Sequence, residues 1–388
     1  VKIGNITIGG TNPIAVQTML NVPVKDIAGN VEQAKRVAKA GCQIVRVTVP
    51  TPADAAVVSA IKEAVDIPVV ADIHFDYRAA LAAIDAGADK IRINPGNIGD
   101  DDRVKAVADA CNAKNIPIRI GVNGGSLEKH ILARYGAPVP EAMVESAMYH
   151  VRLLEKHDFN NIVISIKSSN VPRMMAAYRL LASQTDYPLH VGVTEAGDGE
   201  DGRIKSALGI GALLADGLGD TIRVSLSEAP EAEIPVARKL VDYIMQHQDH
   251  PYIPGVEAEG FNYLSPVRRE TTAVRNIGGN HLPVVIAERM DGKFDTNPQF
   301  IPDYIYAGRA LPETREEGVE YILDADVWEE EPGTYPAFNY QQMPLMGNCQ
   351  ADLKFMFMPY MAQTEEVIAC LKYHPEVVII SQSNHPNR

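Results

Sequence analysis

Charged and amide side chains recur at every second position in seven short segments within the first 225 positions of this 388-residue chain. The positions between them are almost all Val or Ile. Because successive side chains of a β-strand point to opposite faces, each segment is expected to be a strand with one polar and one apolar face. The segments are Ile44–Val49, Ala71–His74, Lys90–Asn94, Ile118–Asn123, Ile164–Lys167, His190–Glu195 and Thr221–Ser225.

Five of these polar positions carry a cation close to the end of the strand. Forked guanidinium groups and an ammonium group that converge suit a phosphate or diphosphate. The following loops agree, since Asn94–Asn97 and Asn123–Ser126 contain glycine and offer backbone amides, and Ser169 precedes a helix start. A single arginine here would more often form a structural ion pair, but four arginines and a lysine on one phase favour a ligand. The predicted ligand-binding residues are Arg46, Arg92, Asn94, Arg119, Asn123, Lys167, Ser169, Arg223 and Ser225.

Three further residues are candidates for catalysis. Asp72 and His74 are two positions apart and therefore face the same side, where they could orient a substrate hydroxyl or transfer a proton. Equally, they could form a hydrogen-bonded network that holds the arginines in place. Glu195 could bind a hydroxyl or neutralise Lys167 or Arg223. Asp72 and His74 supply only two ligands, so the sequence predicts no metal site.

The polar segments alternate with helical patterns. An eighth strand is expected at Ile14–Met19, and a short hairpin precedes it at Lys2–Gly10. Eight strands, each followed by a helix, predict a (β/α)8 barrel with its site at the carboxyl ends of the strands. A doubly wound open sheet is the alternative, but it needs fewer strands and would not give all of them a polar face. The predicted helices are Val31–Ala40, Ala53–Val65, Tyr77–Ala86, Asp102–Ala113, Pro140–Lys156, Val171–Ser183, Arg203–Ala215 and Ala232–Met245.

The pattern changes near His247. Residues 246–251 and Pro254–Gly255 resemble a linker, which predicts a barrel over residues 1–246 and a smaller, incomplete α/β domain over residues 251–388. The chain would then end abruptly after a strand and Asn384–Pro386. Predicted elements of the second domain are strands Leu282–Ala287, Tyr321–Leu323, Leu353–Met358 and Val377–Ser381 and a helix at Gln363–Tyr373.

Composition limits the classes of partner. The net charge of −14 argues against nucleic acid and anionic membranes. No apolar run is long enough to cross a membrane. The four cysteines have no metal-binding spacing and are expected to be free thiols in a reducing compartment, which indicates a cytoplasmic protein.

The polar motifs, in order, resemble one enzyme family. Residues 45–50 (VRVTVP), 71–75 (ADIHF), 90–97 (KIRINPGN), 120–127 (IGVNGGSL), 166–170 (IKSSN), 190–197 (HVGVTEAG) and 220–226 (DTIRVSL) are similar to those of 4-hydroxy-3-methylbut-2-enyl diphosphate synthase. The resemblance covers nearly all of residues 1–245. It implies an oxidoreductase of the methylerythritol phosphate route to isoprenoids, which reductively opens 2-C-methyl-D-erythritol 2,4-cyclodiphosphate. It also implies that the five cations clamp the diphosphate, assisted by Asn94, Asn123 and Ser225.

One part of the family pattern does not occur here. The family passes electrons through a 4Fe–4S cluster held by three cysteines and a glutamate in a C-terminal domain with a Cys-Pro-x-Cys-Gly motif. The resemblance therefore implies a long, three-domain form, as in plants, Bacteroidetes and Chlamydiae, in which residues 251–388 are part of an inserted domain and the cluster domain is absent. This chain would be the substrate-binding portion, with no bound cofactor and inactive alone. The parent would be a bacterial cytoplasmic homodimer that accepts electrons from ferredoxin or flavodoxin.

Two other functions stay open. A pterin-binding transferase also places Asp, Asn, Lys and Arg at the strand ends of a barrel, and would prefer a pterin to the cyclic diphosphate. A non-catalytic diphosphate-binding protein would lack a cluster domain in its parent gene.

Overall fold

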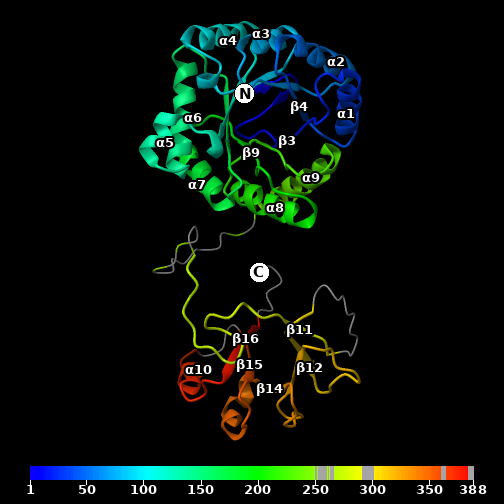
Figure 1. The fold of residues 1–388 in the computed structure, drawn as a ribbon, viewed down its shortest axis with the longest axis vertical. Coiled ribbons are helices and arrows are strands. Elements are labelled where there is room, and N and C mark those ends of the chain that lie inside the picture. The colour runs from blue at the N-terminus through cyan, green and yellow to red at the C-terminus, as the bar shows by residue number, and fades with distance from the viewer. Residues whose placement is uncertain are drawn as a thin grey trace. The chain divides into compact units, whose positions relative to one another are not determined.

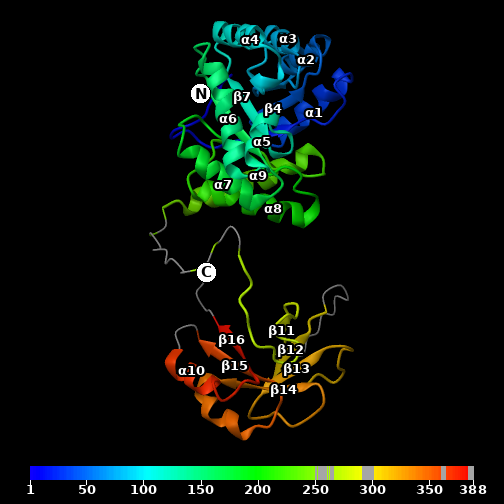
Figure 2. The ribbon, with the colours of Figure 1, turned by 60° about the vertical axis from the view of Figure 1, so that its left-hand side comes forward.

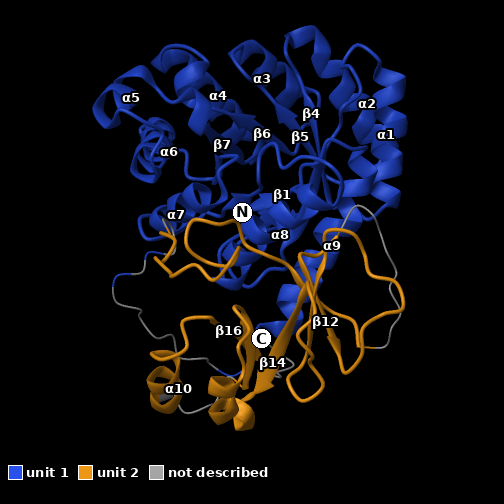
Figure 3. Ribbon diagram, turned by 60° about the horizontal axis from the view of Figure 1, so that its bottom comes forward, with its two compact units in different colours: residues 1–265 blue, residues 266–388 orange. Residues whose placement is uncertain are grey.

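The computed structural model describes residues 1–249, 251, 260, 262, 266–290, 301–359 and 364–382. The chain forms two compact units, residues 1–265 and residues 266–388 (Figure 3). The predicted linker residues 254–255, the first residue of the helix predicted at Gln363–Tyr373, and Asn384–Pro386 lie outside the described residues.

The first unit is an eight-stranded parallel barrel, as predicted (Figure 1). The strands follow one another in the spatial order β8-β7-β6-β5-β4-β3-β10-β9. A parallel bridge between Ile164 and Leu189 closes the ring between β8 and β9, with Ile164 N donating to Pro188 O at 2.9 Å. The strands are β3 Ala15–Met19, β4 Ile44–Thr48, β5 Val69–Asp72, β6 Lys90–Ile93, β7 Ile118–Asn123, β8 Ile162–Lys167, β9 His190–Val191 and β10 Thr221–Ile222.

Helices surround the strands and cover their apolar face (Figure 1). Side-chain caps start several of them; Asp26, for example, accepts from Gly29 N, so the first helix begins four residues before the predicted start. The short helix α5 was not predicted, and Pro52–Ala55 forms a separate 3-10 turn before α2. The helices are α1 Ile27–Lys39, α2 Ala56–Ala64, α3 Tyr77–Asp85, α4 Asp101–Lys114, α5 Lys129–Tyr135, α6 Pro140–Glu155, α7 Val171–Ala182, α8 Gly199–Ala215 and α9 Pro230–His247.

The amino-terminal hairpin belongs to the floor of the barrel. Strands β1 (Lys2–Ile3) and β2 (Ile6–Thr7) pair antiparallel, as predicted. Ile3 and Ile8 join one buried apolar cluster with inward residues from the first two positions of four barrel strands. Those inward residues are Ala15, Ile44, Val70 and Val163. The apolar floor therefore leaves the carboxyl ends of the strands as the polar end of the interior.

The second unit contains a curled sheet of six parallel strands, which follow one another in sequence order (Figure 2). The strands of this sheet do not carry the alternating polar face of the barrel strands, because their inner side is filled by an apolar cluster that includes Tyr304, Tyr335 and Phe355. Two of the strands, β12 and β14, were not predicted; β14 contains Pro336, which weakens a strand signal. The elements are β11 Ile286–Glu288, β12 Tyr304–Gly308, β13 Glu320–Asp324, β14 Thr334–Asn339, β15 Lys354–Pro359, α10 Thr364–Leu371 and β16 Val377–Gln382.

Candidate active site

The polar phase of the barrel strands faces the interior. Register places Asp72 beside Arg92, Arg92 beside Arg119, and Asn123 beside Lys167 on neighbouring strands. Above the apolar floor the interior therefore contains mostly cations. The inward cations are Arg46, Lys90, Arg92, Arg119, Lys167 and Arg223.

Asp72 is the anionic centre of this group. Its Oδ2 lies 3.0 Å from Arg46 Nη2 and 3.8 Å from His74 Nε2, and its Oδ1 lies 3.2 Å from Arg92 Nη1. Burial alone would raise the pKa of the Asp72 carboxyl, but Arg46 and then Arg92 hold it well below its usual value. The fully buried Asp72 is thus ionised and anchors two arginines, whereas the imidazole of His74 is half exposed at the mouth.

Arg92 depends on a glycine next to it. Its Nη2 donates to Gly121 O at 2.8 Å, while Gly121 N donates to Asn94 Oδ1 at 2.9 Å. A Cβ atom at Gly121 would lie 2.6 Å from Arg92 Nε, closer than side chains can approach. Residue 121 must therefore be glycine for the guanidinium to occupy this place, and the oxygen of Asn94 is already in use, which leaves its amide nitrogen for a ligand.

Arg119 is fully buried and only partly satisfied. Its Nη1 donates to Ser165 Oγ at 2.9 Å, whereas Nε and Nη2 find no hydrogen-bond partner in the described part of the chain. Burial lowers the pKa of its guanidinium well below the usual value, and the nearby Arg46 and Arg92 lower it further. A buried cation without a partner is costly, so an anion bound here would offset an existing penalty.

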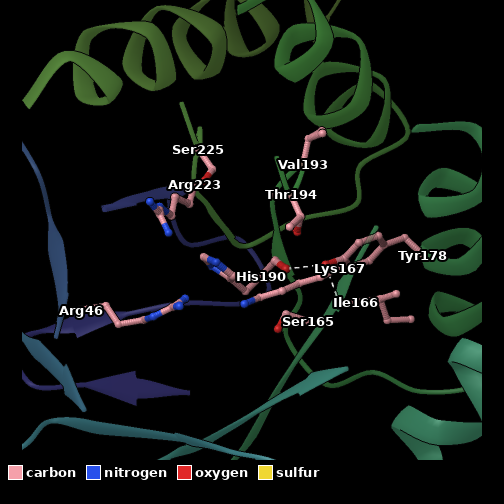
Figure 4. Close-up of a pocket in the computed structure, with 11 residues that line it drawn as sticks. Arg46, Ser165, Ile166, Lys167, Tyr178, His190, Val193, Thr194, Arg223 and Ser225 are labelled. Carbon is pink, nitrogen blue, oxygen red and sulfur yellow. Dashed lines mark hydrogen bonds between the residues drawn. The ribbon is translucent and has the colours of Figure 1, made fainter. Parts of the chain in front are cut away.

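A cavity of about 90 Å³ opens among the cations. Figure 4 shows Arg46, Lys167, His190 and Arg223 pointing into the same space. Burial lowers the pKa of the Lys167 amine to about 6, and the neighbouring arginines at positions 46, 92 and 119 lower it in the same direction. The amine can therefore gain a proton when an anion enters. The other lining residues are Ser165, Ile166, Tyr178, Gly192, Val193, Thr194 and Ser225.

His190 was not among the predicted site residues, although it lies on the polar phase of its strand. Its Nδ1 lies 2.7 Å from Thr221 Oγ1 on the adjacent strand β10, which fixes the ring and leaves Nε2 for the cavity. Burial keeps the pKa of the imidazole well below its usual value, and Arg119 and Lys90 add to the shift. His190 thus contributes a neutral polar group. The alternation that identified the arginines would have identified His190 too.

Arg223 pairs with an acid that the sequence analysis missed. Its Nε and Nη2 lie 3.3 Å from the two carboxylate oxygens of Glu233 on helix α9. Glu233 is buried and also accepts from Thr18 Oγ1 at 2.6 Å and from Leu226 N at 3.1 Å. The sequence did contain a signal for this acid, because Glu233 lies on the apolar side of the helix predicted at Ala232–Met245.

Glu195 lies elsewhere. Its side chain is exposed and its backbone is left-handed, with φ of 53°. Among the described contacts it makes no ion pair with Lys167 or Arg223; its carbonyl accepts from Lys205 Nζ at 3.4 Å. The structure therefore does not bring Glu195 to the cations that the sequence analysis offered as its partners.

The remaining predicted residues line the mouth. The exposed Asn123 uses its Oδ1 to accept from Gly125 N at 3.1 Å, which leaves its amide nitrogen free for a ligand. Ser169 is exposed, directly before the Asn170 side chain that caps helix α7.

Within the described residues, no group of three or more His, Cys, Asp or Glu side chains could hold a metal ion. Cys42 and Cys111 are buried separately, and burial raises the pKa of their thiols to about 11 and about 12. Cys349 and Cys370 belong to the second unit. In the described part of the chain, no helix is both long and apolar enough to cross a membrane.

A family model and the most similar curated proteins indicate one family. A family model described as the GcpE TIM-barrel domain matches residues 1–238. The whole chain aligns with 68% of the 4-hydroxy-3-methylbut-2-en-1-yl diphosphate synthase (flavodoxin) of Bacteroides thetaiotaomicron, at 59% identity over 420 residues. The enzyme of the same name from Fusobacterium nucleatum is 57% identical over 241 residues, which cover 62% of this chain and 68% of that protein. Among solved structures, a dihydropteroate synthase from Xanthomonas albilineans in complex with 7,8-dihydropteroate matches with a TM-score of 0.44 and 15% identity, over 62% of this chain and 94% of that one.

Proposed function

The chain belongs to the 4-hydroxy-3-methylbut-2-en-1-yl diphosphate synthase family, and from that premise we propose that its barrel binds 2-C-methyl-D-erythritol 2,4-cyclodiphosphate. The excess of basic side chains in the barrel interior carries the proposal: within the described residues, six inward arginines and lysines face two buried acids, Asp72 and Glu233. A cyclic diphosphate supplies the anionic charge that this interior lacks. The acidic surface of the chain makes a nonspecific attraction of anions an inadequate explanation.

Each group of residues has a distinct part in this proposal. Arg46, Arg92, Arg119, Lys167 and Arg223 bind phosphate oxygens. The amide nitrogens of Asn94 and Asn123, together with Ser169 and Ser225, donate hydrogen bonds from the mouth and the cavity wall. The Asp72 carboxylate fixes two of the arginines rather than taking up a proton, because they keep it ionised.

His74 and Glu195 remain the proposed residues for the substrate's hydroxyl groups. His74 lies at the mouth, 3.8 Å from Asp72. Glu195 begins the short loop over residues 195–198, before helix α8, and its exposed carboxylate would reach the substrate only after this loop moves over the mouth.

In our proposal, the electrons for the reductive opening of the substrate come from a group outside this chain. The family is an iron–sulfur enzyme, but the cysteines here do not fit a 4Fe–4S cluster, because Cys42 and Cys111 are buried apart from each other in the barrel and the other two belong to the second unit. We therefore assign to residues 1–246 the binding of the substrate and to residues 251–388 part of an inserted domain. The complete enzyme would supply the cluster, accept electrons from flavodoxin and act as a homodimer in the bacterial cytoplasm.

Calorimetric titration with the cyclic diphosphate tests the proposal. Arg119→Ala removes one charged donor, worth roughly 1.5–3 kcal/mol, so affinity should fall by about tenfold or more. The control is Arg78→Ala, because the Arg78 side chain is 69% exposed and pairs only with Asp76 among its described ion pairs. Arg238 is a poorer control, since it donates to Gln43 at 2.6 Å. Equal affinities of both variants for the ligand would reject the clamp.

A further inference from the structure

A buried histidine outside the cation cluster connects two loops at the mouth of the barrel. His150 lies on helix α6 and is completely inaccessible to solvent. Its Nδ1 accepts a hydrogen bond from Gly96 N at 3.1 Å, and its Nε2 lies 2.7 Å from Glu128 Oε1. Gly96 belongs to the loop after β6 and Glu128 to the loop after β7, so one imidazole contacts both.

The contacts determine the protonation of the ring. Because Gly96 N donates to Nδ1, the neutral imidazole must carry its proton on Nε2, on the side of Glu128. Burial would raise the pKa of the Glu128 carboxyl, but hydrogen bonds from His150 and Ser146 lower it to about 2. Glu128 is therefore ionised, and its carboxylate contacts the ring at 2.7 Å.

Packing leaves the first loop no freedom to move toward α6. A Cβ atom at Gly96 would lie 2.9 Å from His150 Cε1, so the loop backbone rests directly on the ring. The two loops begin at Asn94 and Asn123, whose oxygens are held by Gly121 N and Gly125 N. His150 thus contacts both of the loops that follow these two asparagines.

We propose that His150 is a positioning residue for the diphosphate site, which holds the loop of residues 94–97 and the loop of residues 124–128 at the separation that one ligand requires. This inference rests on the proposed function. His150 itself is too deeply buried to touch the ligand. Its effect is on binding through the geometry of the two loops.

Two substitutions separate the two halves of the link. An Asn side chain places its oxygen near the position of Nδ1, so His150→Asn keeps the acceptor for Gly96 N. A Gln side chain reaches the position of Nε2, so His150→Gln keeps the contact with Glu128 and leaves the Gly96 amide without an acceptor. A control is His130→Gln, since His130 is exposed on α5 and its ring lies 5.5 Å from Tyr149, the neighbour of His150.

The measurements are calorimetric affinity for the cyclic diphosphate, amide hydrogen exchange of residues 94–97, and the midpoint of thermal unfolding. We expect His150→Gln to weaken binding by about tenfold, the effect of one lost buried hydrogen bond, and to accelerate exchange at Gly96. His150→Asn should restore most of the affinity and the slow exchange, although both variants lose the same amount of thermal stability.

Two results would overturn the inference. One is unchanged affinity in His150→Gln while Arg119→Ala binds weakly. The other is an equal loss of affinity in both His150 variants that follows their thermal midpoints, which would indicate a purely structural histidine. If the unaltered chain does not bind the cyclic diphosphate, the proposed function fails first, and this inference fails with it.

Discussion

Replacing Lys167 by methionine should make the barrel more stable, and the gain should depend on pH. In the folded chain, burial is the main cause that lowers the pKa of Lys167 from 10.5 to about 6. Between these values the unfolded chain holds a proton that the folded chain has lost. The stability of the unaltered protein therefore rises with pH across this range. Methionine has similar length and no charge, so Lys167→Met removes this dependence.

The size of the effect follows from the shift. Each pH unit within the window changes the free energy of unfolding by up to about 1.4 kcal/mol. Across three pH units, from pH 6 to pH 9, the advantage of Lys167→Met over the unaltered chain should shrink by about 4 kcal/mol. Groups that both proteins share contribute to both curves and cancel in the difference.

Urea unfolding at several pH values between 6 and 9 measures this difference. Far-UV circular dichroism reports mainly on the barrel, which contains most of the described helices. The chain has a single tryptophan, Trp328 in the second unit, so its fluorescence shows whether that unit is unaffected. Lys35→Met is the control, because Lys35 is half exposed and pairs with Glu32. Parallel pH curves for Lys167→Met and the unaltered chain would refute the reasoning.

Three further outcomes follow from the site. Gly121→Ala should lower the free energy of unfolding by roughly 1–3 kcal/mol through overpacking and should weaken ligand binding, because the added Cβ would lie 2.6 Å from Arg92 Nε and displace the guanidinium. Unchanged stability in urea unfolding would contradict this contact. Glu233→Gln should destabilise the chain by roughly 1–3 kcal/mol, since it leaves Arg223 without an anion, whereas Glu231→Gln breaks only the surface pair with Arg36 and should cost under about 1 kcal/mol. Anaerobic reconstitution of the 388-residue chain with iron and sulfide should give no cluster absorbance, and a strong reductant should give no product. Fusion of the chain to a cluster domain should give both. Turnover by the chain alone would overturn the proposal that the electrons come from a cluster outside this chain.

The barrel and its cations could be predicted because both depend on a single local regularity. Alternation in Lys90–Asn94 and Ile118–Asn123 identified the inward face of each strand and thus Arg92 and Arg119. The resemblance to a known family used the same motifs, and family membership and the barrel are confirmed.

The partners of those cations could not be predicted in the same way. Glu233 reaches Arg223 from a helix, where the spacing of residues says nothing about which strand end it will meet. Glu195 is an odd number of positions after His190, so it does not share the polar phase of that segment, and the backbone becomes left-handed at this residue, where the alternation has ended. The two-residue β9 shows why: the ladder stops at Val191, so later residues no longer obey strand geometry.

The distribution of charge explains how the fold tolerates such a site. The apolar floor and the outer helices bury enough surface to stabilise a barrel whose polar interior has too few anions. Within the described residues, two donors of Arg119 have no hydrogen-bond partner and burial lowers the pKa of Lys167, so the burial of these groups offsets part of the folding free energy. A bound diphosphate would remove both costs at once, since it pairs with the donors and restores the charge on the amine. The fold would then gain stability from the ligand that it binds, and proton uptake would accompany binding near neutral pH.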